Sequence, residues 1–96
     1  MLKTTFEWDP DKDSINRRKH GISFLFARRA FWDPQRVIAR DLTHSDKEER
    51  YFCFGKAEGE VITVRFTYRE HTIRIIGAGY WRRGKAAYEK ENKIHG

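Results

Sequence analysis

The sequence predicts a single α+β domain, because helical patterns occupy its first third and strand patterns occupy most of the remainder. A length of 96 residues with 39% hydrophobic content is enough for one domain with a modest core and too little for two. The segment 80–93 returns to a helical pattern. We therefore expect residues 1–96 to form one domain that ends in a C-terminal helix.

Two helices are predicted ahead of the strands. After a short first strand within residues 2–8, Asp9 is an N-cap candidate followed by proline, and Gly21 follows a basic last turn. The helix between them has few apolar residues and should lie on the surface. Ser23 then caps a second helix, residues 24–32, whose apolar face predicts the main packing against the sheet.

Four strands are predicted after residue 35, from runs rich in Val, Ile, Thr, Tyr and Phe. These runs are "RVIARDL", "EERYFCFG", "EVITVRFTYR" and "TIRIIGAG". Because only the short turn "REH" joins the last two runs, we expect them to pair antiparallel.

Three arginines should share one face of this last hairpin. Side chains alternate along a strand, so Arg65 and Arg69 point away from the apolar face, and Arg74 of the partner strand can join them. Like charges this close repel unless negative charge lies between them. Either an anionic ligand supplies that charge or neighbouring carboxylates do, the candidates being Asp41, Glu48 and Glu49.

Charge and composition limit the partners and the compartment. Twenty Lys and Arg against 14 Asp and Glu give a formal charge of +6 and a pI near 9.7, which favours a polyanion such as RNA or an acidic protein. The single cysteine, Cys53, lies in an apolar run and has no partner for an internal disulfide, which suggests a reducing compartment. We expect a cytoplasmic protein without a membrane segment, because the sequence has no apolar leader and no run of eighteen apolar residues.

Motifs of several other enzyme classes are missing from the sequence. It contains no C-x-x-C, no H-E-x-x-H, no glycine-rich phosphate loop and no G-x-S-x-G. We therefore predict neither a metal site nor a cofactor.

Five segments together resemble the BrnT family of toxins from bacterial toxin–antitoxin pairs. They are "FEWDPDKDSINRRKHGISF", "AFWDP", "DLTHSDKEERYFCFG", "VRFTYREHTIRII" and the late Tyr88. The resemblance implies a RelE-like fold, with helices packed on one face of a small antiparallel sheet. It also implies a ribonuclease that inhibits translation, is neutralised by a BrnA-like antitoxin, and meets operator DNA only as the toxin–antitoxin complex.

Metal-free RNA cleavage needs a base near the 2′-hydroxyl, fixed positive charge on the phosphorus centre and an acid for the leaving oxygen. Arginine suits the second task because its planar guanidinium binds phosphate through two hydrogen bonds. The predicted catalytic residues are His44, Glu49, Arg50, Arg65, Arg69 and Arg74. The predicted RNA-binding residues are Lys19, His20, Thr67, Tyr80, Arg82 and Arg83.

Several of these residues also have structural explanations. His44 can belong to a turn or cap, and Glu49 can serve only to orient Arg50. Lys19 and His20 can do no more than complement the helix dipole.

One motif departs from the family pattern. Many relatives read R-I-I-S-A-R where this chain has "RIIGAG", so Gly77 replaces a serine and Gly79 replaces an arginine. Either Arg82 or Arg83 takes over the missing phosphate contact, or the protein is a non-catalytic module that binds nucleic acid or the antitoxin.

Overall fold

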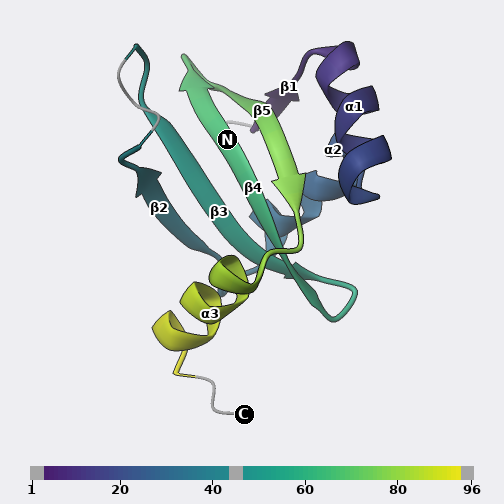
Figure 1. Cartoon of the computed structure of the whole chain (residues 1–96). Coiled ribbons are helices and arrows are strands. Elements are labelled where there is room, and N and C mark those ends of the chain that lie inside the picture. The colour runs from purple at the N-terminus through teal and green to yellow at the C-terminus, as the bar shows by residue number, and fades with distance from the viewer. Residues whose placement is uncertain (1–3, 44–46, 94–96) are drawn as a thin grey trace.

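A five-stranded mixed sheet in the order β1-β5-β4-β3-β2 forms the centre of the computed structural model, which describes residues 4–43 and 47–93 (Figure 1). The strands are β1 (Thr5–Glu7), β2 (Val37–Asp41), β3 (Arg50–Ala57), β4 (Glu60–Arg69) and β5 (Thr72–Gly79). The helices are α1 (Pro10–His20), α2 (Phe24–Ala27), the 3₁₀ helix η1 (Arg28–Trp32) and α3 (Arg82–Glu91). This confirms the predicted α+β class and the C-terminal helix.

The sheet differs from the predicted antiparallel sheet at one edge. Strands β2 to β5 are antiparallel neighbours, but β1 pairs parallel with β5, so that Phe6 lies beside Ile73 and Glu7 beside Arg74. A short hairpin turn forces antiparallel pairing. Strand β1 instead continues into α1 and pairs with β5, a strand that is distant from it in the sequence. The mixed sheet therefore follows from the helical connection after β1.

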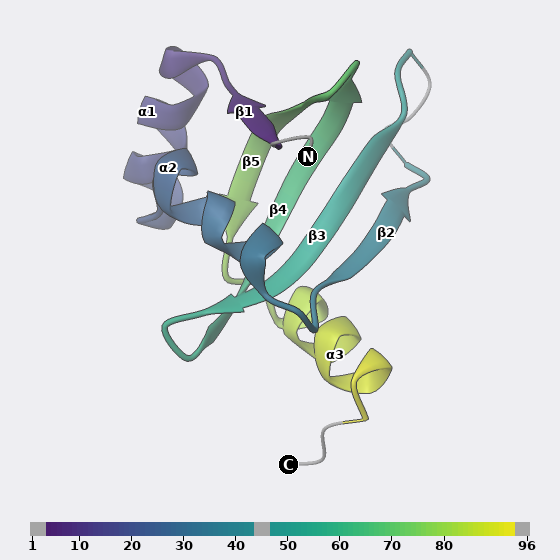
Figure 2. The same ribbon diagram turned by 180° about the vertical axis from the view of Figure 1, so that it is seen from behind.

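Helices lie on both faces of the sheet, with η1 on one face and the predicted C-terminal helix α3 on the other. A Cβ atom on Gly55 of β3 would meet the backbone of Ala30 in η1, whereas Phe54 beside it lies close to Gly84 of α3. Consecutive strand residues point to opposite faces, so η1 and α3 must lie on opposite sides. Figure 1 shows α3 in front of the sheet, and Figure 2 shows α2 and η1 on the other side.

The main core lies between the sheet and the α2–η1 segment. Its buried members come from that segment, from β3, from β4 and from β5, and include Phe24, Ala27, Ala30, Cys53, Val64, Phe66 and Ile75. Burial raises the pKa of the Cys53 thiol to about 12, so this cysteine packs as an apolar residue with no thiolate at neutral pH.

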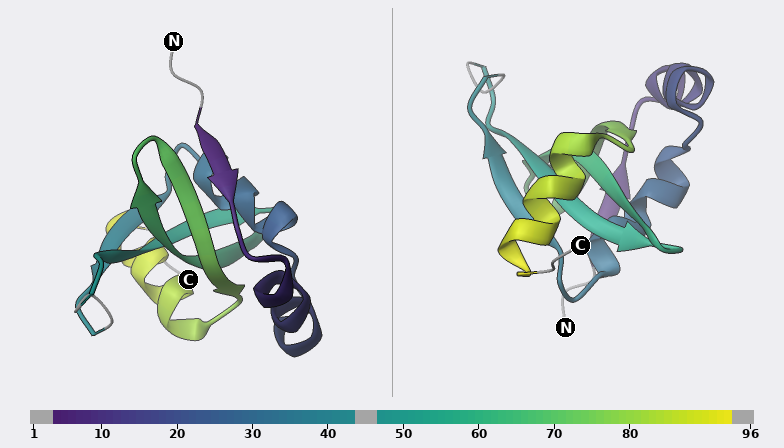
Figure 3. Two further views of the ribbon diagram at one scale, coloured as in Figure 1. Left: turned by 90° about the horizontal axis from the view of Figure 1, so that it is seen from above. Right: turned by 60° about the horizontal axis from the view of Figure 1, so that its bottom comes forward.

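Helix α1 attaches to the end of β5 through a buried asparagine rather than an apolar stripe. The amide of Asn16 donates to the carbonyl oxygens of Ala78 and Ile22, at 2.9 and 3.0 Å, and its oxygen accepts from the Ala78 N–H. The predicted ends of this helix are confirmed, since the Asp9 side chain accepts from Asp11 and Gly21 has φ 69°. The view from above in Figure 3 shows α1 beside the β5 edge.

Helix α3 approaches the sheet more closely than a side chain would permit. A Cβ on Gly84 would lie 1.9 Å from the Thr63 hydroxyl oxygen, so glycine here permits the contact between helix and sheet. One turn later the buried Tyr88 donates a 2.6 Å hydrogen bond to Asp33. Tyr80 and Trp81, predicted within this helix, precede its first residue.

Candidate functional site

Strand register places four of the predicted arginines on the face of the sheet that α3 partly covers. Arg65 lies opposite Phe52 in β3, and Arg74 lies opposite Thr67 in β4. Arg69 follows Arg65 by four residues in β4, so it shares the same side. The predicted convergence of Arg65, Arg69 and Arg74 is thus present in the register. Arg50 joins the same face, two residues before Phe52.

Carboxylates lie beside all four of these arginines. Arg74 forms a 2.6 Å ion pair and hydrogen bond with Glu7 of β1. Arg50 and Arg69 each lie 3.8 Å from a different oxygen of Glu48. Sequence reasoning proposed Glu48 as a partner but missed Glu7, because only the parallel pairing of β1 with β5 brings Glu7 beside Arg74.

Arg65 has a different environment. Its Nε lies 3.6 Å from the buried carboxylate of Asp41, and its guanidinium carbon lies 5.9 Å from the ring centre of Phe52. Nε is buried and makes no hydrogen bond within residues 4–43 and 47–93. The side chain is 37% exposed. Arg65 is therefore held by its ion pair with Asp41 and by an aromatic ring, with Nε buried and the rest of the side chain partly exposed.

A groove of about 560 Å³ opens beside Arg65, between α1, the sheet and the start of α3. We call it the cationic groove, and its charged and aromatic lining consists of Lys12, Lys19, His20, Phe52, Phe54, Arg65, Trp81 and Arg83. No acidic side chain lines it among the described residues. Lys12, Lys19 and Arg83 also form no ion pair within the described part of the chain. The groove is thus a concentrated positive site, in which Arg65 has a carboxylate partner and Lys12, Lys19 and Arg83 have none among the described residues.

Trp81 fills the space that a side chain at position 79 would need. A Cβ on Gly79 would lie 2.6 Å from the Trp81 ring, and the same ring packs edge-on against His20 at 5.1 Å. At Gly77 the nearest atom would be 4.0 Å away, so that position has room. The two glycines that depart from the family pattern therefore differ, because only Gly79 is linked to the placement of an aromatic ring.

The N-terminus of α3 adds positive potential at the mouth of this groove. The helix begins at Arg82, and the structure shows no side-chain hydrogen bond that caps its first turn. The free N–H groups of a helix start attract anions, as does the helix dipole. Arg83 therefore enters the groove at the end of the helix that best receives a phosphate.

The structure does not bring Glu49 to the arginine face. Its carboxylate accepts hydrogen bonds from Arg40 at 2.6 Å and from the Tyr51 hydroxyl at 2.8 Å, and both of these side chains point to the opposite face from Arg50. The hydrogen bond to Glu49 raises the pKa of Tyr51. Glu49 thus orients Arg40 and Tyr51, and it does not form an ion pair with Arg50.

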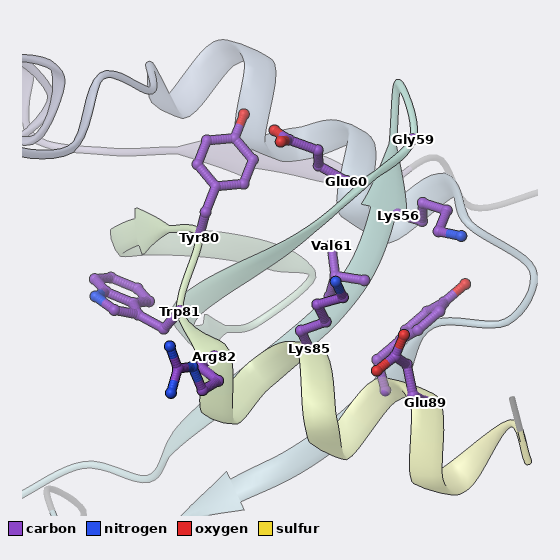
Figure 4. Close-up of a pocket in the computed structure, with 10 residues that line it drawn as sticks. Lys56, Gly59, Glu60, Val61, Tyr80, Trp81, Arg82, Lys85 and Glu89 are labelled. Atoms are coloured by element: carbon purple, nitrogen blue, oxygen red, sulfur yellow. The ribbon is translucent and has the colours of Figure 1, made fainter. Parts of the chain in front are cut away.

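The remaining predicted residues fall in three places. Thr67 is buried, and its hydroxyl donates a 2.7 Å hydrogen bond to the Glu49 carbonyl, so it offers no surface to RNA. Tyr80 and Arg82 line a second groove of about 540 Å³ on the far side of Trp81 (Figure 4). His44 lies outside the residues that the structure describes.

The sequence model of BrnT ribonuclease toxins of type II toxin–antitoxin systems matches residues 8–84. The chain belongs to this family. The match extends from Trp8 to Gly84 and so includes every charged residue of the cationic groove. No curated protein sequence gives a significant match. Ribonuclease activity and an antitoxin partner are therefore features of the family to which the chain belongs.

None of the helices within residues 4–43 and 47–93 has the length and apolar character to cross a membrane. Over the same residues, His, Cys, Asp and Glu side chains do not gather in groups of three or more that could hold a metal ion.

Proposed function

We propose that the chain is an endoribonuclease toxin that cleaves RNA without a metal and holds the scissile phosphate in the cationic groove. The observation that supports this most is the cationic groove itself, which Arg65 lines together with further cations and which no described carboxylate lines. Arg83 and Lys19 face the same space. Arg50, Arg69 and Arg74 extend the positive face outside the groove lining, each beside a carboxylate, as Arg65 is beside Asp41.

The reaction we propose uses the 2′-hydroxyl as the nucleophile. A general base accepts the 2′-hydroxyl proton while the 2′-oxygen bonds to phosphorus, and an acid donates a proton to the 5′-oxygen as its bond to phosphorus breaks. The products are a 2′,3′-cyclic phosphate and a 5′-hydroxyl. Arg65 and Arg83 stabilise the charge that develops on the phosphate oxygens.

Two histidines are candidates for the proton transfers. His44 is the residue that the sequence favours, and His20 is the one that the structure brings into the cationic groove. Imidazole can both accept and donate a proton near neutral pH, which suits either half of the reaction. Glu49 is a weaker candidate, because Arg40 and Tyr51 engage its carboxylate on the other face.

The biological setting follows from the family. We propose that a BrnA-like antitoxin neutralises the chain, that uncontrolled RNA cleavage inhibits translation, and that operator DNA is contacted only by the toxin–antitoxin complex. A cytoplasmic location agrees with the buried cysteine and with RNA as the substrate.

The decisive experiment is cleavage of RNA by the purified chain in the presence of EDTA. We expect products that end in a 2′,3′-cyclic phosphate, and we expect a substrate with 2′-deoxyribose at the cleaved position to resist. His20→Ala and His44→Ala should each be measured, and the variant that lacks the acid or base should lose about 10²- to 10⁴-fold in rate. Loss of cleavage on adding EDTA, restored by a divalent metal, contradicts the metal-free scheme.

A non-catalytic binding protein is the second candidate, and the Gly79–Trp81 pair favours it. An aromatic ring covers the position at which relatives carry an arginine, so one phosphate contact of the family is replaced. Induction of the chain in a bacterium, alone and together with the antitoxin, separates the two candidates. Growth arrest that the antitoxin relieves supports the toxin, whereas RNA binding without cleavage or arrest supports the binding protein.

A further inference from the structure

Trp81 stands between two grooves and lines both of them. Trp81 belongs to the lining of the cationic groove and to that of the second groove. In the second groove, Trp81 and Arg82 form one end, Lys85 and Glu89 lie along α3, and Tyr80 stands beside Glu60 (Figure 4). Trp81 is 43% exposed, and its contacts with Gly79 and His20 fix the ring. A strand that enters one groove can therefore cross Trp81 into the other.

Two neighbouring arginines serve the two grooves separately. Successive helix residues point about 100° apart, and accordingly Arg83 lines the cationic groove while Arg82 lines the second groove. Neither forms an ion pair within the part of the chain that the structure describes. A pair of phosphates from consecutive nucleotides could thus each meet one guanidinium at the start of α3.

The second groove combines aromatic rings with hydrogen-bond acceptors. Tyr80 and Trp81 are half-exposed at its mouth, and aromatic rings stack on unpaired bases. Glu60 and Glu89 supply carboxylates, which accept hydrogen bonds from exocyclic amino groups such as the cytosine N4 amine. Burial and the nearby Glu60 and Glu58 raise the pKa of Tyr80, so its hydroxyl stays protonated and can donate.

We infer that the second groove is a base-reading subsite for an unpaired nucleotide adjacent to the cleaved bond. It takes single-stranded RNA, with the base on Trp81 and Tyr80, the phosphate on Arg82, and a preference for bases that carry an exocyclic amino group. This inference rests on the proposed function, since it assumes that RNA occupies the cationic groove.

The test measures binding of single-stranded, fully 2′-O-methylated oligocytidylate and oligouridylate of equal length by fluorescence anisotropy. These strands cannot be cut through a 2′-hydroxyl, so binding is measured apart from cleavage. We expect the wild-type chain to bind the cytosine strand at least about fivefold more tightly, the smallest effect typical of a base-reading contact. Glu89→Gln should lose most of this preference, because a neutral acceptor forms a weaker hydrogen bond than a carboxylate.

Glu91→Gln is the matched control, because it removes the same charge from the same helix at an exposed position outside the groove. It should keep the preference and change both affinities alike. Trp81→Ala should weaken binding of both strands, and Trp81→Phe should restore most of it, with thermal melts to verify the fold. Equal affinity of the wild type for both strands, or equal effects of the two glutamate variants, overturns the inference.

The outcomes also separate this inference from the proposed function. Cleavage of ordinary RNA without any base preference retains the ribonuclease and rejects the subsite. A preference that depends on Glu89, found in a chain that cuts nothing, retains the subsite and rejects the catalytic role. Substitutions at Arg82 and Lys85 that weaken antitoxin binding and leave RNA binding unchanged would make the second groove a protein interface and reject the subsite.

Discussion

Arg65→Ala should abolish most RNA cleavage, whereas Arg69→Ala should leave most of it. Arg65 lines the cationic groove, while Arg69 lies outside the groove lining, is 52% exposed and lies 3.8 Å from Glu48. Loss of one fixed donor to a developing oxyanion costs about 10²- to 10³-fold in rate. For Arg69→Ala we expect a change of about threefold or less, the scale of an exposed ion pair. Single-turnover cleavage of one RNA by both variants provides the comparison.

The same substitution must be separated from a loss of stability. Removal of Arg65 leaves the carboxylate of Asp41, which is 4% exposed, without this cation. The cost should be about 1–2 kcal/mol, below that of a fully buried pair, because Arg65 is 37% exposed and the Thr43 N–H still donates to Asp41. Arg65→Lys keeps the charge and should melt close to the wild type, yet cleave slowly. Equal loss of activity in the Arg65→Ala and Arg69→Ala variants, or full activity in Arg65→Ala, would refute the assignment.

Three further predictions concern stability and charge. Tyr88→Phe should destabilise the fold by about 1–2 kcal/mol at pH 7 in urea unfolding, because Asp33 loses a hydrogen bond. Burial by itself raises the pKa of Asp33, but hydrogen bonds from Tyr88 and two backbone amides outweigh it and lower this pKa. The loss of stability should therefore shrink as the pH falls below about 4 and Asp33 is protonated. Gly84→Ala should destabilise by about 1–3 kcal/mol despite the better helix propensity of alanine, because the new Cβ meets Thr63. Arg83→Ala should reduce the slope of log affinity against log salt for RNA by about one.

Helix caps and strand alternation predicted most of the fold, because both depend on residues that are close together in the sequence. The caps at Asp9, Gly21 and Ser23 have the expected conformations and hydrogen bonds, and the four later strands form as their alternation predicts. The second helix changes to a 3₁₀ helix after Ala27, and local patterns do not distinguish these two helix types. The parallel β1 edge and the placement of α3 on the opposite face depend on contacts between distant segments.

For α1 the sequence predicted an exposed helix but not the residue that attaches this helix to the sheet. The polar stripe along this helix indicated an exposed element, yet Asn16 is buried and binds the backbone of β5. A buried amide with its hydrogen bonds satisfied can attach a helix as an apolar residue does. Hydrophobic periodicity contains no signal for this contact, so sequence alone placed the helix on the surface without its anchor.

Part of the candidate site was also visible in the sequence. Strand alternation was sufficient to place Arg65, Arg69 and Arg74 on one face. Which carboxylate meets which arginine depends on the packing of side chains from separate strands, and for this reason Glu48 rather than Glu49 lies beside Arg50. The cationic groove itself needs α1 and α3 to converge, and no local pattern specifies that convergence.

Two explanations of the arginine cluster, pairing with carboxylates and binding of an anion, are compatible with each other. Arg65, Arg69 and Arg74 each have a carboxylate partner, so the folded chain compensates part of their charge. Of the four arginines on this face, Arg65 alone also lines the cationic groove. Its carboxylate partner Asp41 does not line that groove, whereas Lys12, Lys19 and Arg83 do. A phosphate in the groove would therefore meet Arg65 together with cations that have no carboxylate partner among the described residues, which makes Arg65 the member of the cluster best placed to bind it.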